Sequence, residues 1–594
     1  MTDKRFDLAI VNGTVVDGSG LPRRRADVGV KDGRIAEVGF VDAAEADQVI
    51  DATGLVVAPG IVDAHTHYDP QLTFDPYATS SCYHGVTTVL AGNCGFSIAP
   101  TRADDRGFIT QMFARVEGMS PKALDGLPWD FETFPEYLAA REGKLGVNLA
   151  CYIGHSAVRR FVMGDASFER EATDEEVAAM CRIVGEAMEA GAAGFSSSHA
   201  PTHFDSYDRP VPSRVSSKSE LEALVAEAGQ HNGGTIAYLP FGSIGGLDAE
   251  GEEALIRLST ISRMPVIIQG LGARSKVDAP TAGWDNAKRF VEEATERGAA
   301  VYSLLMAKPF NRTFTLAAGT SLYQGVLELN RLFTEASTVA ERTALLHDEA
   351  FRAAIRGSVK HPNKDAAKGP TLPPPHWSTL HVSRVTLPEN EGYVGRSVKE
   401  IAAERGVAEE DAMVDLALSE DLAVEFVWKT ETPAWREGTR VAQLDPHMLL
   451  GTSDGGAHLD RDDGAEWSSY FLRYWVREWG AWTLEEGIRQ LTQLPAALLG
   501  FADRGMLRPF FAADIMVFDP DTISPDHKEF VHDFPNGEGR FTSRPAGVHA
   551  TIVNGVPIVR DGVLVEGSGL PGQVLRPRTA FASTDGPSDM GHRA

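Results

Sequence analysis

The chain has 594 residues, of which 43% are hydrophobic and 23% charged, and its net charge at pH 7 is −27. This length predicts a large catalytic core with one or two smaller units, and the acidic balance argues against nucleic acid or an anionic membrane surface as partners. Four cysteines make no disulfide framework in so long a chain. Neither a signal peptide nor an apolar run of ~18 residues is evident, so we expect a cytoplasmic protein.

The two ends of the chain share a pattern of short strands joined by tight turns. Residues 6–57 alternate strand-like runs with Asn-Gly and Asp-Gly turns, and the same pattern returns at 548–565. We predict that residues 1–57 and 503–576 meet in one small β-sandwich domain. The tail at 577–594 is expected to be disordered.

Between these ends, apolar runs alternate with amphipathic helical stretches, which is the pattern of βαβ units. One helix is expected at 173–191, where Thr173 and Glu176 form a capping box and Gly191 ends the run. The expected strands lie at 57–65, 85–92, 146–154, 193–197, 235–240, 265–270, 300–306 and 448–453. We therefore predict an α/β fold, a (β/α)8 TIM-like barrel over 58–502, with the active site at the C-terminal ends of the strands.

The barrel pattern lapses between 307 and 447. A helical stretch at 319–357 leads to a Pro-rich segment that contains PPPHW (373–377), and a strand-like and a helical run follow. We predict an insertion before the last barrel strand that acts as a lid over the active-site mouth.

The first candidate for chemistry is His65-Thr66-His67, at the end of an apolar run. In a strand, side chains at i and i+2 point to the same side, so both imidazoles can bind one metal, and Asp63 is expected to point the same way. The alternative is two unrelated polar residues after a buried strand. The position on the first predicted barrel strand favours the metal site.

The second candidate is Asp454 in GTSDGGAH, at the end of the last predicted barrel strand. A carboxylate here can bind a metal and take a proton from metal-bound water. The alternative is a simple Asx-type turn, which Asp-Gly sequences form readily.

The third candidate is Cys94 in AGNCGFS, just after the second strand. A thiolate is a good zinc ligand, and Gly92 and Gly95 would let the backbone approach the site closely. The alternative is a buried cysteine in a tight turn.

The segments VAPGIVDAHTHYDP, GVTTVLAGNCG, YIGHSAVR and SDGGAH and the closing VNG strands resemble the N-acyl-D-amino-acid deacylase (D-aminoacylase) branch of the amidohydrolase superfamily. The resemblance implies a barrel with a β-sandwich side domain, zinc, and hydrolysis of an amide-like bond. It also implies that His65 and His67 are first-strand ligands, that Cys94 is the bridging ligand, and that Asp454 is both a ligand and the general base.

That family has histidines at the ends of strands five and six, where this chain has Leu239 and Gln269. Neither side chain replaces imidazole well, so we expect about one tightly bound metal, zinc, per chain. The family's substrate-reading lysine is absent too, and Arg461 is the nearest candidate for its carboxylate-reading arginine. A substrate carboxylate would then lack a strong cationic partner, so neutral or apolar substrates are expected to be preferred over N-acyl-D-amino acids.

Other histidines remain as candidates. His155 and His458 could hold a developing oxyanion or orient the substrate, so both are predicted catalytic residues. His199 and His203 follow strand four and could line the mouth, whereas His84 is expected to be structural.

We therefore predict a metal-dependent amidohydrolase that cleaves a non-peptide carbon–nitrogen bond in a small molecule, with Asp454 as general base. The alternatives are a lactone, ester or cyclic-amide hydrolase on the same site, or a barrel that binds without catalysis. Barrels of this type often form dimers or larger rings, so a homo-oligomer is expected.

Overall fold

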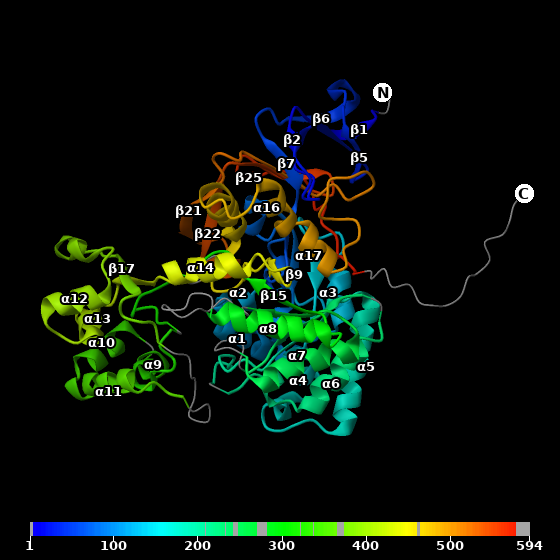
Figure 1. The fold of residues 1–594 in the computed structure, drawn as a ribbon. Helices are drawn as coiled ribbons and strands as arrows, with labels where there is room; N and C mark the ends of the chain where they lie inside the picture. The colour runs from blue at the N-terminus through cyan, green and yellow to red at the C-terminus, as the bar shows by residue number, and fades with distance from the viewer. Residues whose placement is uncertain are drawn as a thin grey trace, which may run out of the picture.

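The computed structural model describes residues 4–577 except 208, 232, 242–246, 270–281, 310, 321, 337, 365–373 and 460–463. The predicted disordered tail therefore lies almost wholly outside the described residues. Within the described part of the chain, no helix is both long and apolar enough to cross a membrane. Figure 1 shows a central α/β body, a strand-rich unit at one end of it, and a helical lobe at its side.

Parallel strands form the centre of the body. They are β8 (Ile61–Asp63), β9 (Val86–Ala91), β10 (Asn148–Cys151), β11 (Ile153–Gly154), β12 (Gly194–Ser198), β13 (Thr235–Leu239), β14 (Val266–Gln269), β15 (Val301–Leu305) and β19 (Met448–Leu450). They pair in the orders β10-β9-β8 and β11-β12-β13-β14-β15-β19, always in parallel.

The two sheets join at both edges. The Ala193 N–H donates to the carbonyl of Cys151 at 2.8 Å, and the Ala64 N–H donates to that of Gly451 at 2.9 Å. The strands thus follow one another in a closed order, which we call the strand ring. Because the strands are parallel, their C-terminal ends gather at one side.

Each predicted strand coincides with observed strands, but two are divided: residues 146–154 contain both β10 and β11, and the first predicted strand is also split. Residues 57–65 supply both the end of β7 (Val56–Pro59), which pairs antiparallel with β20 (Ile515–Phe518), and the whole of β8. The break lies at Gly60, where an added Cβ would be 2.2 Å from the Thr87 hydroxyl oxygen. One apolar run therefore serves two sheets because the backbones approach closely at a glycine.

Helices follow the ring strands along the chain. They include α1 (Arg106–Glu117), α2 (Pro121–Asp125), α3 (Phe134–Arg141), α4 (His155–Met163), α5 (Asp174–Ala190), α6 (Lys218–Ala228), α7 (Ala249–Ser262), α8 (Ala282–Glu296), α15 (Trp467–Tyr470), α16 (Leu484–Leu491) and α17 (Gln493–Leu498). Thr173 and Glu176 form the predicted capping box at the start of α5, and Gly191 ends the helix with φ +104°. These helix-end predictions are confirmed.

Both ends of the chain contribute to the strand-rich unit. One sheet has the order β5 (Arg34–Gly39), β4 (Asp27–Lys31), β1 (Phe6–Val11), β6 (Ala46–Asp51). The other has the order β25 (Val563–Leu564), β24 (Val556–Arg560), β23 (Val548–Val553), β20, β7, β2 (Thr14–Val15), β3 (Arg24–Arg25). Ile10 and Val28 of the first sheet share a buried core with Val517 and Ile552 of the second.

The lobe beside the body contains an antiparallel sheet in the order β16 (Arg312–Phe314), β18 (Glu425–Trp428), β17 (Leu380–Arg384). Its helices are α9 (Leu327–Thr334), α10 (Val339–His347), α11 (Glu349–Lys360), α12 (Val398–Arg405) and α13 (Glu409–Leu418). Leu329 and Phe426 belong to a core that is separate from that of the body. The lobe is shorter than the predicted insertion at 307–447, since α14 (Pro433–Ala442) packs into the main core through Ala442.

Candidate metal centre

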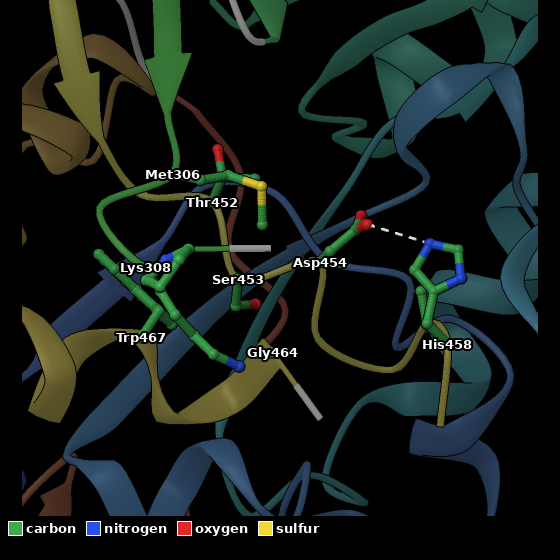
Figure 2. Close-up of a pocket in the computed structure, with 10 residues that line it drawn as sticks. Met306, Lys308, Thr452, Ser453, Asp454, His458, Gly464 and Trp467 are labelled. Carbon is green, nitrogen blue, oxygen red and sulfur yellow. Dashed lines mark ion pairs between the residues drawn. The ribbon is translucent and has the colours of Figure 1, made fainter. Parts of the chain in front are cut away.

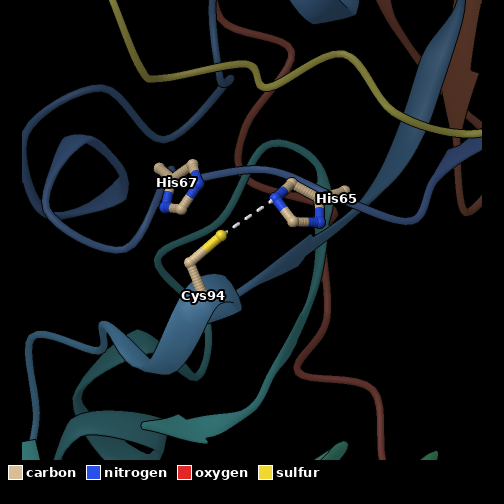
Figure 3. A group of neighbouring side chains, drawn as sticks. All are labelled: His65, His67 and Cys94. Carbon is tan, nitrogen blue, oxygen red and sulfur yellow. Dashed lines mark hydrogen bonds between the residues drawn. The ribbon is translucent and has the colours of Figure 1, made fainter. Parts of the chain in front are cut away.

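His65 and His67 follow the end of β8 and are 4% and 1% exposed. Together with Cys94 they form a group whose ligand atoms all lie within 4.8 Å of one another. Figure 3 shows the Cys94 sulfur between the two imidazole rings, 3.6 Å from Nε2 of His65. The structure thus brings Cys94 next to two histidines, although 29 positions separate it from His65 in the chain.

Asp63 does not join this group, contrary to the expectation from strand alternation. Its carboxylate accepts hydrogen bonds from the Trp467 indole N–H at 3.1 Å and from the backbone N–H groups of His65 and Ser453 at 3.3 and 3.4 Å. Strand β8 ends at Asp63, so the alternation of sides does not continue to the histidines. Asp63 instead ties the His65 segment to the segment that carries Asp454.

Cys94 lies in a short turn in which glycine is required. Gly92, Cys94 and Gly95 have φ values of +76°, +58° and +77°. A Cβ at Gly92 would lie 2.2 Å from the carbonyl oxygen of Tyr152. The turn therefore packs against the neighbouring strand so closely that only glycine fits, as the flanking glycines predicted.

Asp454 lies against both histidines. Its Oδ1 is 3.6 Å from Nε2 of His65 and 3.3 Å from Nε2 of His67. The Asp454 N–H donates to the His65 carbonyl at 3.1 Å, and the His67 N–H donates to the Gly455 carbonyl at 2.7 Å. A Cβ on Gly456 would lie 2.9 Å from the backbone of His67, so glycine there permits this close approach.

Burial and neighbouring charges set the protonation of these groups. Burial lowers the pKa of His65 to about 3, which leaves a neutral imidazole with a free lone pair. Burial also raises the pKa of the Cys94 thiol to about 11. Burial alone would raise the pKa of Asp454, but hydrogen bonds with His458 and His67 hold it well below its usual value. Asp454 is therefore ionised at neutral pH.

His458 completes one side of the site. Its Nε2 lies 3.3 Å from Oδ2 of Asp454, as Figure 2 shows. Both residues line a pocket whose other walls include Met306, Lys308 and Trp467. A ligand in this pocket would meet the Asp454 carboxylate.

A second pocket lies on the other side of the group. His65 and Cys94 line it together with Leu239 and Gln269. These last two residues are the ones that stand where the resembled family has histidines. Among the described residues, the His65–His67–Cys94 group is the one cluster with metal-ligand spacing. Arg461, the predicted candidate for the carboxylate-reading arginine, lies outside that part of the chain.

Sequence reasoning missed a cation in the Asp454 pocket. Lys308, just after β15, lines this pocket and is 8% exposed. Its ammonium lies 2.9 Å from Glu466, which Lys528 also approaches at 3.2 Å. The expectation that a substrate carboxylate would lack a strong cationic partner did not consider Lys308, although this ammonium is already paired with Glu466. A single lysine after a strand matches no motif, so no sequence pattern identified Lys308 as a pocket residue.

Two further residues near the histidines were also missed. Glu117, the last residue of α1, is buried with Oε1 3.5 Å from Nδ1 of His67, and burial raises its pKa to about 7. Arg312 of the lobe places Nη2 3.4 Å from Nε2 of His458. One signal could have found Glu117, because a carboxylate in the last turn of a helix opposes the helix dipole.

The structure does not bring His155 to this group. His155 is fully buried, Nδ1 lies 2.8 Å from the Ser197 hydroxyl and Nε2 2.8 Å from Glu220. Both ring nitrogens are thus occupied inside the protein, and Arg159 pairs with the same glutamate. This geometry corrects the prediction that His155 contacts substrate.

The remaining histidines also have internal partners. His199 contacts the hydroxyls of Tyr238 and Ser216, and His84 contacts two serines, as expected of structural histidines. His203 bonds to Ser198 through Nδ1 and packs against Phe96.

The donor set fits a divalent metal ion. Two imidazoles, a thiol and a carboxylate are ligands that zinc prefers. The buried carboxyl group of Glu117 lies 3.5 Å from His67, so a further acidic group stands next to the candidate ligands. Parallel strands that present such donors at their C-terminal ends are typical of a metal-dependent hydrolase.

Comparisons with known proteins agree with this class. The model of the Amidohydrolase family matches residues 48–559. D-aminoacylase from Alcaligenes xylosoxydans xylosoxydans is 30% identical over 93% of this chain and 94% of its own length. N-acyl-D-aspartate deacylase from the same organism is 28% identical over 97% of this chain and 96% of its own length. A crystal structure of D-aminoacylase covers 96% of this chain and 100% of that chain, with 26% identity and a TM-score of 0.63.

The chain belongs to the Amidohydrolase family. It is a metal-dependent hydrolase that acts on carbon–nitrogen bonds other than peptide bonds.

Proposed function

We propose that this enzyme removes the acyl group from an N-acylated amino acid, using His65, His67, Cys94 and Asp454 to hold a zinc ion on a (β/α)8 barrel. The observation that carries the proposal is the position of the Asp454 carboxylate, 3.3 to 3.6 Å from Nε2 of both histidines. This carboxylate also lines a pocket together with Lys308 and Trp467. The deacylase names of the relatives support the choice of bond.

When bound, zinc would lower the pKa of a water molecule and polarise the scissile carbonyl. Asp454, ionised at neutral pH, accepts the proton of the attacking water and returns it to the departing nitrogen. His458 orients this carboxylate through its contact at 3.3 Å and can donate to the oxyanion. His155 has no part in the proposed mechanism.

One tightly bound metal is part of the proposal. Leu239 and Gln269 give the second pocket no strong additional ligand. For D-aminoacylase itself, one solved structure (26% identity, TM-score 0.61) is described in terms of a binuclear metal centre, with one-metal activation and second-metal attenuation.

The proposed substrate carries a carboxylate, which reverses the sequence-based preference for neutral compounds. Lys308 lines the same pocket as Asp454, and its ammonium is paired with Glu466 at 2.9 Å. A buried ammonium can form a charge-assisted hydrogen bond with a substrate carboxylate. A lactone, ester or cyclic-amide substrate need not carry a carboxylate that could pair with this ammonium.

An activity screen of zinc-loaded enzyme tests the proposal. The panel contains N-acetyl amino acids of both hands, their carboxamide-capped analogues, lactones and cyclic imides. We expect hydrolysis of N-acetyl amino acids and little of the capped compounds. Preferential turnover of lactones or cyclic imides would contradict the proposed bond.

Elemental analysis after exhaustive dialysis tests the metal count. We expect near one equivalent of zinc in the wild type, falling toward zero in His65→Ala. Two equivalents that survive dialysis would contradict the single site, and absence of metal would favour a barrel that only binds.

We further propose a β-sandwich side domain built from residues 1–57 and 503–576 and a lid formed by the lobe. A cytoplasmic location is supported by the cysteines, all of which are free.

We also propose that the chain assembles into a homo-oligomer. Light scattering tests this by measuring the molecular mass in solution.

A further inference from the structure

Glu117 occupies an unusual position for a carboxylate. It is the last residue of α1 and is 3% exposed. The C-terminus of a helix carries partial negative charge, so a carboxylate there is disfavoured, and burial adds to the cost. A residue that violates both preferences needs a compensating partner.

That partner is His67. Nε2 of His67 points to the metal group, 3.3 Å from Asp454. The opposite ring nitrogen, Nδ1, lies 3.5 Å from Oε1 of Glu117 and has no other hydrogen-bond partner in the part of the chain that the structure describes. An approach of a few tenths of an ångström would make this a normal hydrogen bond, with Nδ1–H donating to the carboxylate.

The backbone holds Glu117 in place for this contact. Gly118, with φ +65°, ends α1 directly after it, and its N–H donates to the carbonyl of Ala114 at 3.1 Å. The carbonyl of Glu117 accepts a hydrogen bond from the N–H of His458. The end of α1 is thus connected both to His67 and to the turn that carries Asp454.

We infer that Glu117 is a positioning residue that accepts a hydrogen bond from Nδ1 of His67 and thereby presents Nε2 of that ring to the zinc ion. The inference rests on the proposed metal centre. A carboxylate on the far nitrogen fixes the tautomer and the orientation of a ligating histidine and makes it more basic. This predicts a specific effect on metal affinity.

The test measures zinc affinity of Glu117→Gln by competition with a chromophoric chelator. Glutamine keeps the size of the side chain but loses its charge. We expect affinity to fall about 10- to 100-fold, with one equivalent still bound at saturating zinc. Glu117→Asp, which restores the charge, should recover part of the loss.

The chain offers a matched control in Glu220→Gln. Glu220 is also buried and also bonds to a histidine, His155, at 2.8 Å, but this histidine is outside the metal group. This control should change the melting temperature while leaving zinc affinity within about twofold. A comparable loss of affinity in both variants would show general destabilisation and overturn the inference.

Replacing zinc with Co²⁺ tests whether Glu117 positions His67 or binds the metal directly. The visible absorption bands of the Co²⁺ form should keep their positions and intensities in Glu117→Gln, because the ligands are unchanged. A spectrum that indicates a different coordination number would make Glu117 a ligand and overturn the inference, as would unchanged zinc affinity in the folded variant. None of these measurements uses a substrate, so they stand even if N-acyl amino acids are not hydrolysed.

Discussion

At the scale of single residues, the proposed mechanism depends most on Asp454. Asp454→Asn preserves shape but removes the proton acceptor, so we expect kcat to fall about 10³-fold. The fold should remain intact, because the side chain borders a pocket and contributes little packing. Kinetics at saturating zinc, with metal content measured on the same sample, separate the loss of the base from the loss of a ligand. Near-normal kcat in the metal-loaded variant would remove Asp454 from the mechanism.

Lys308 is the residue that should select the substrate. Lys308→Met removes the ammonium from the pocket wall, and hydrogen bonds to charged groups contribute about 1.5–3 kcal/mol, so KM for N-acetyl amino acids should rise about 10- to 100-fold. Carboxamide-capped analogues should be unaffected. Lys528→Met is the control, since Lys528 shares Glu466 with Lys308 but is not among the residues that line the pocket. An equal effect of both substitutions on KM would assign Lys308 a structural role.

At the scale of one element, the start of α5 should give a pH-dependent contribution to stability. Hydrogen bonds from Arg170 and from the Thr173 backbone lower the pKa of Glu176 from 4.5 to about 2. A folded-state pKa below the unfolded value means that the ionised form stabilises the fold above pH 4.5, and that this contribution is lost as the pH falls toward 2. Glu176→Gln should therefore lower the melting temperature at pH 7 but matter progressively less between pH 4.5 and 3.

Glu175→Gln is the matched control for this helix. Glu175 lies in the same first turn, so its loss removes the same favourable charge from the helix N-terminus, but it takes no part in the capping box. Its effect at pH 7 should be smaller. Indistinguishable melting curves for the two variants would exclude a capping contribution from Glu176.

At the scale of the whole molecule, the lobe and the body have separate hydrophobic cores. Leu329→Ala empties a fully buried position in the lobe core and should cost about 2–5 kcal/mol. Calorimetry should show an earlier transition for the lobe, while the metal content of the protein stays unchanged. Activity should fall as the lobe opens, since Arg312 of β16 contacts His458. Leu224→Ala, at a fully buried position in the body core, is the control and should shift the main transition instead. A single transition displaced by either substitution would show that the two cores unfold together.

The sequence alone determined much of this protein, because the relevant signals are local. Apolar runs located the ring strands, and Thr173, Glu176 and Gly191 marked both ends of α5, since capping depends on residues a few positions apart. His65, His67, Cys94 and Asp454 were recognisable because each follows an apolar run in a short motif, and parallel strands bring such ends together.

Other features were decided only by the tertiary structure, because they depend on contacts between distant segments. Gly60 divides one apolar run between two sheets owing to the close approach of Thr87. His155 ended a predicted strand, as the proposed ligands did, yet Glu220 and Ser197 are bonded to its two ring nitrogens. Lys308 and Glu117 carry no motif, and their roles arise from the pocket and the histidine that the fold places beside them. The energy of a buried charge depends on which groups surround it, and that neighbourhood exists only once the chain has folded.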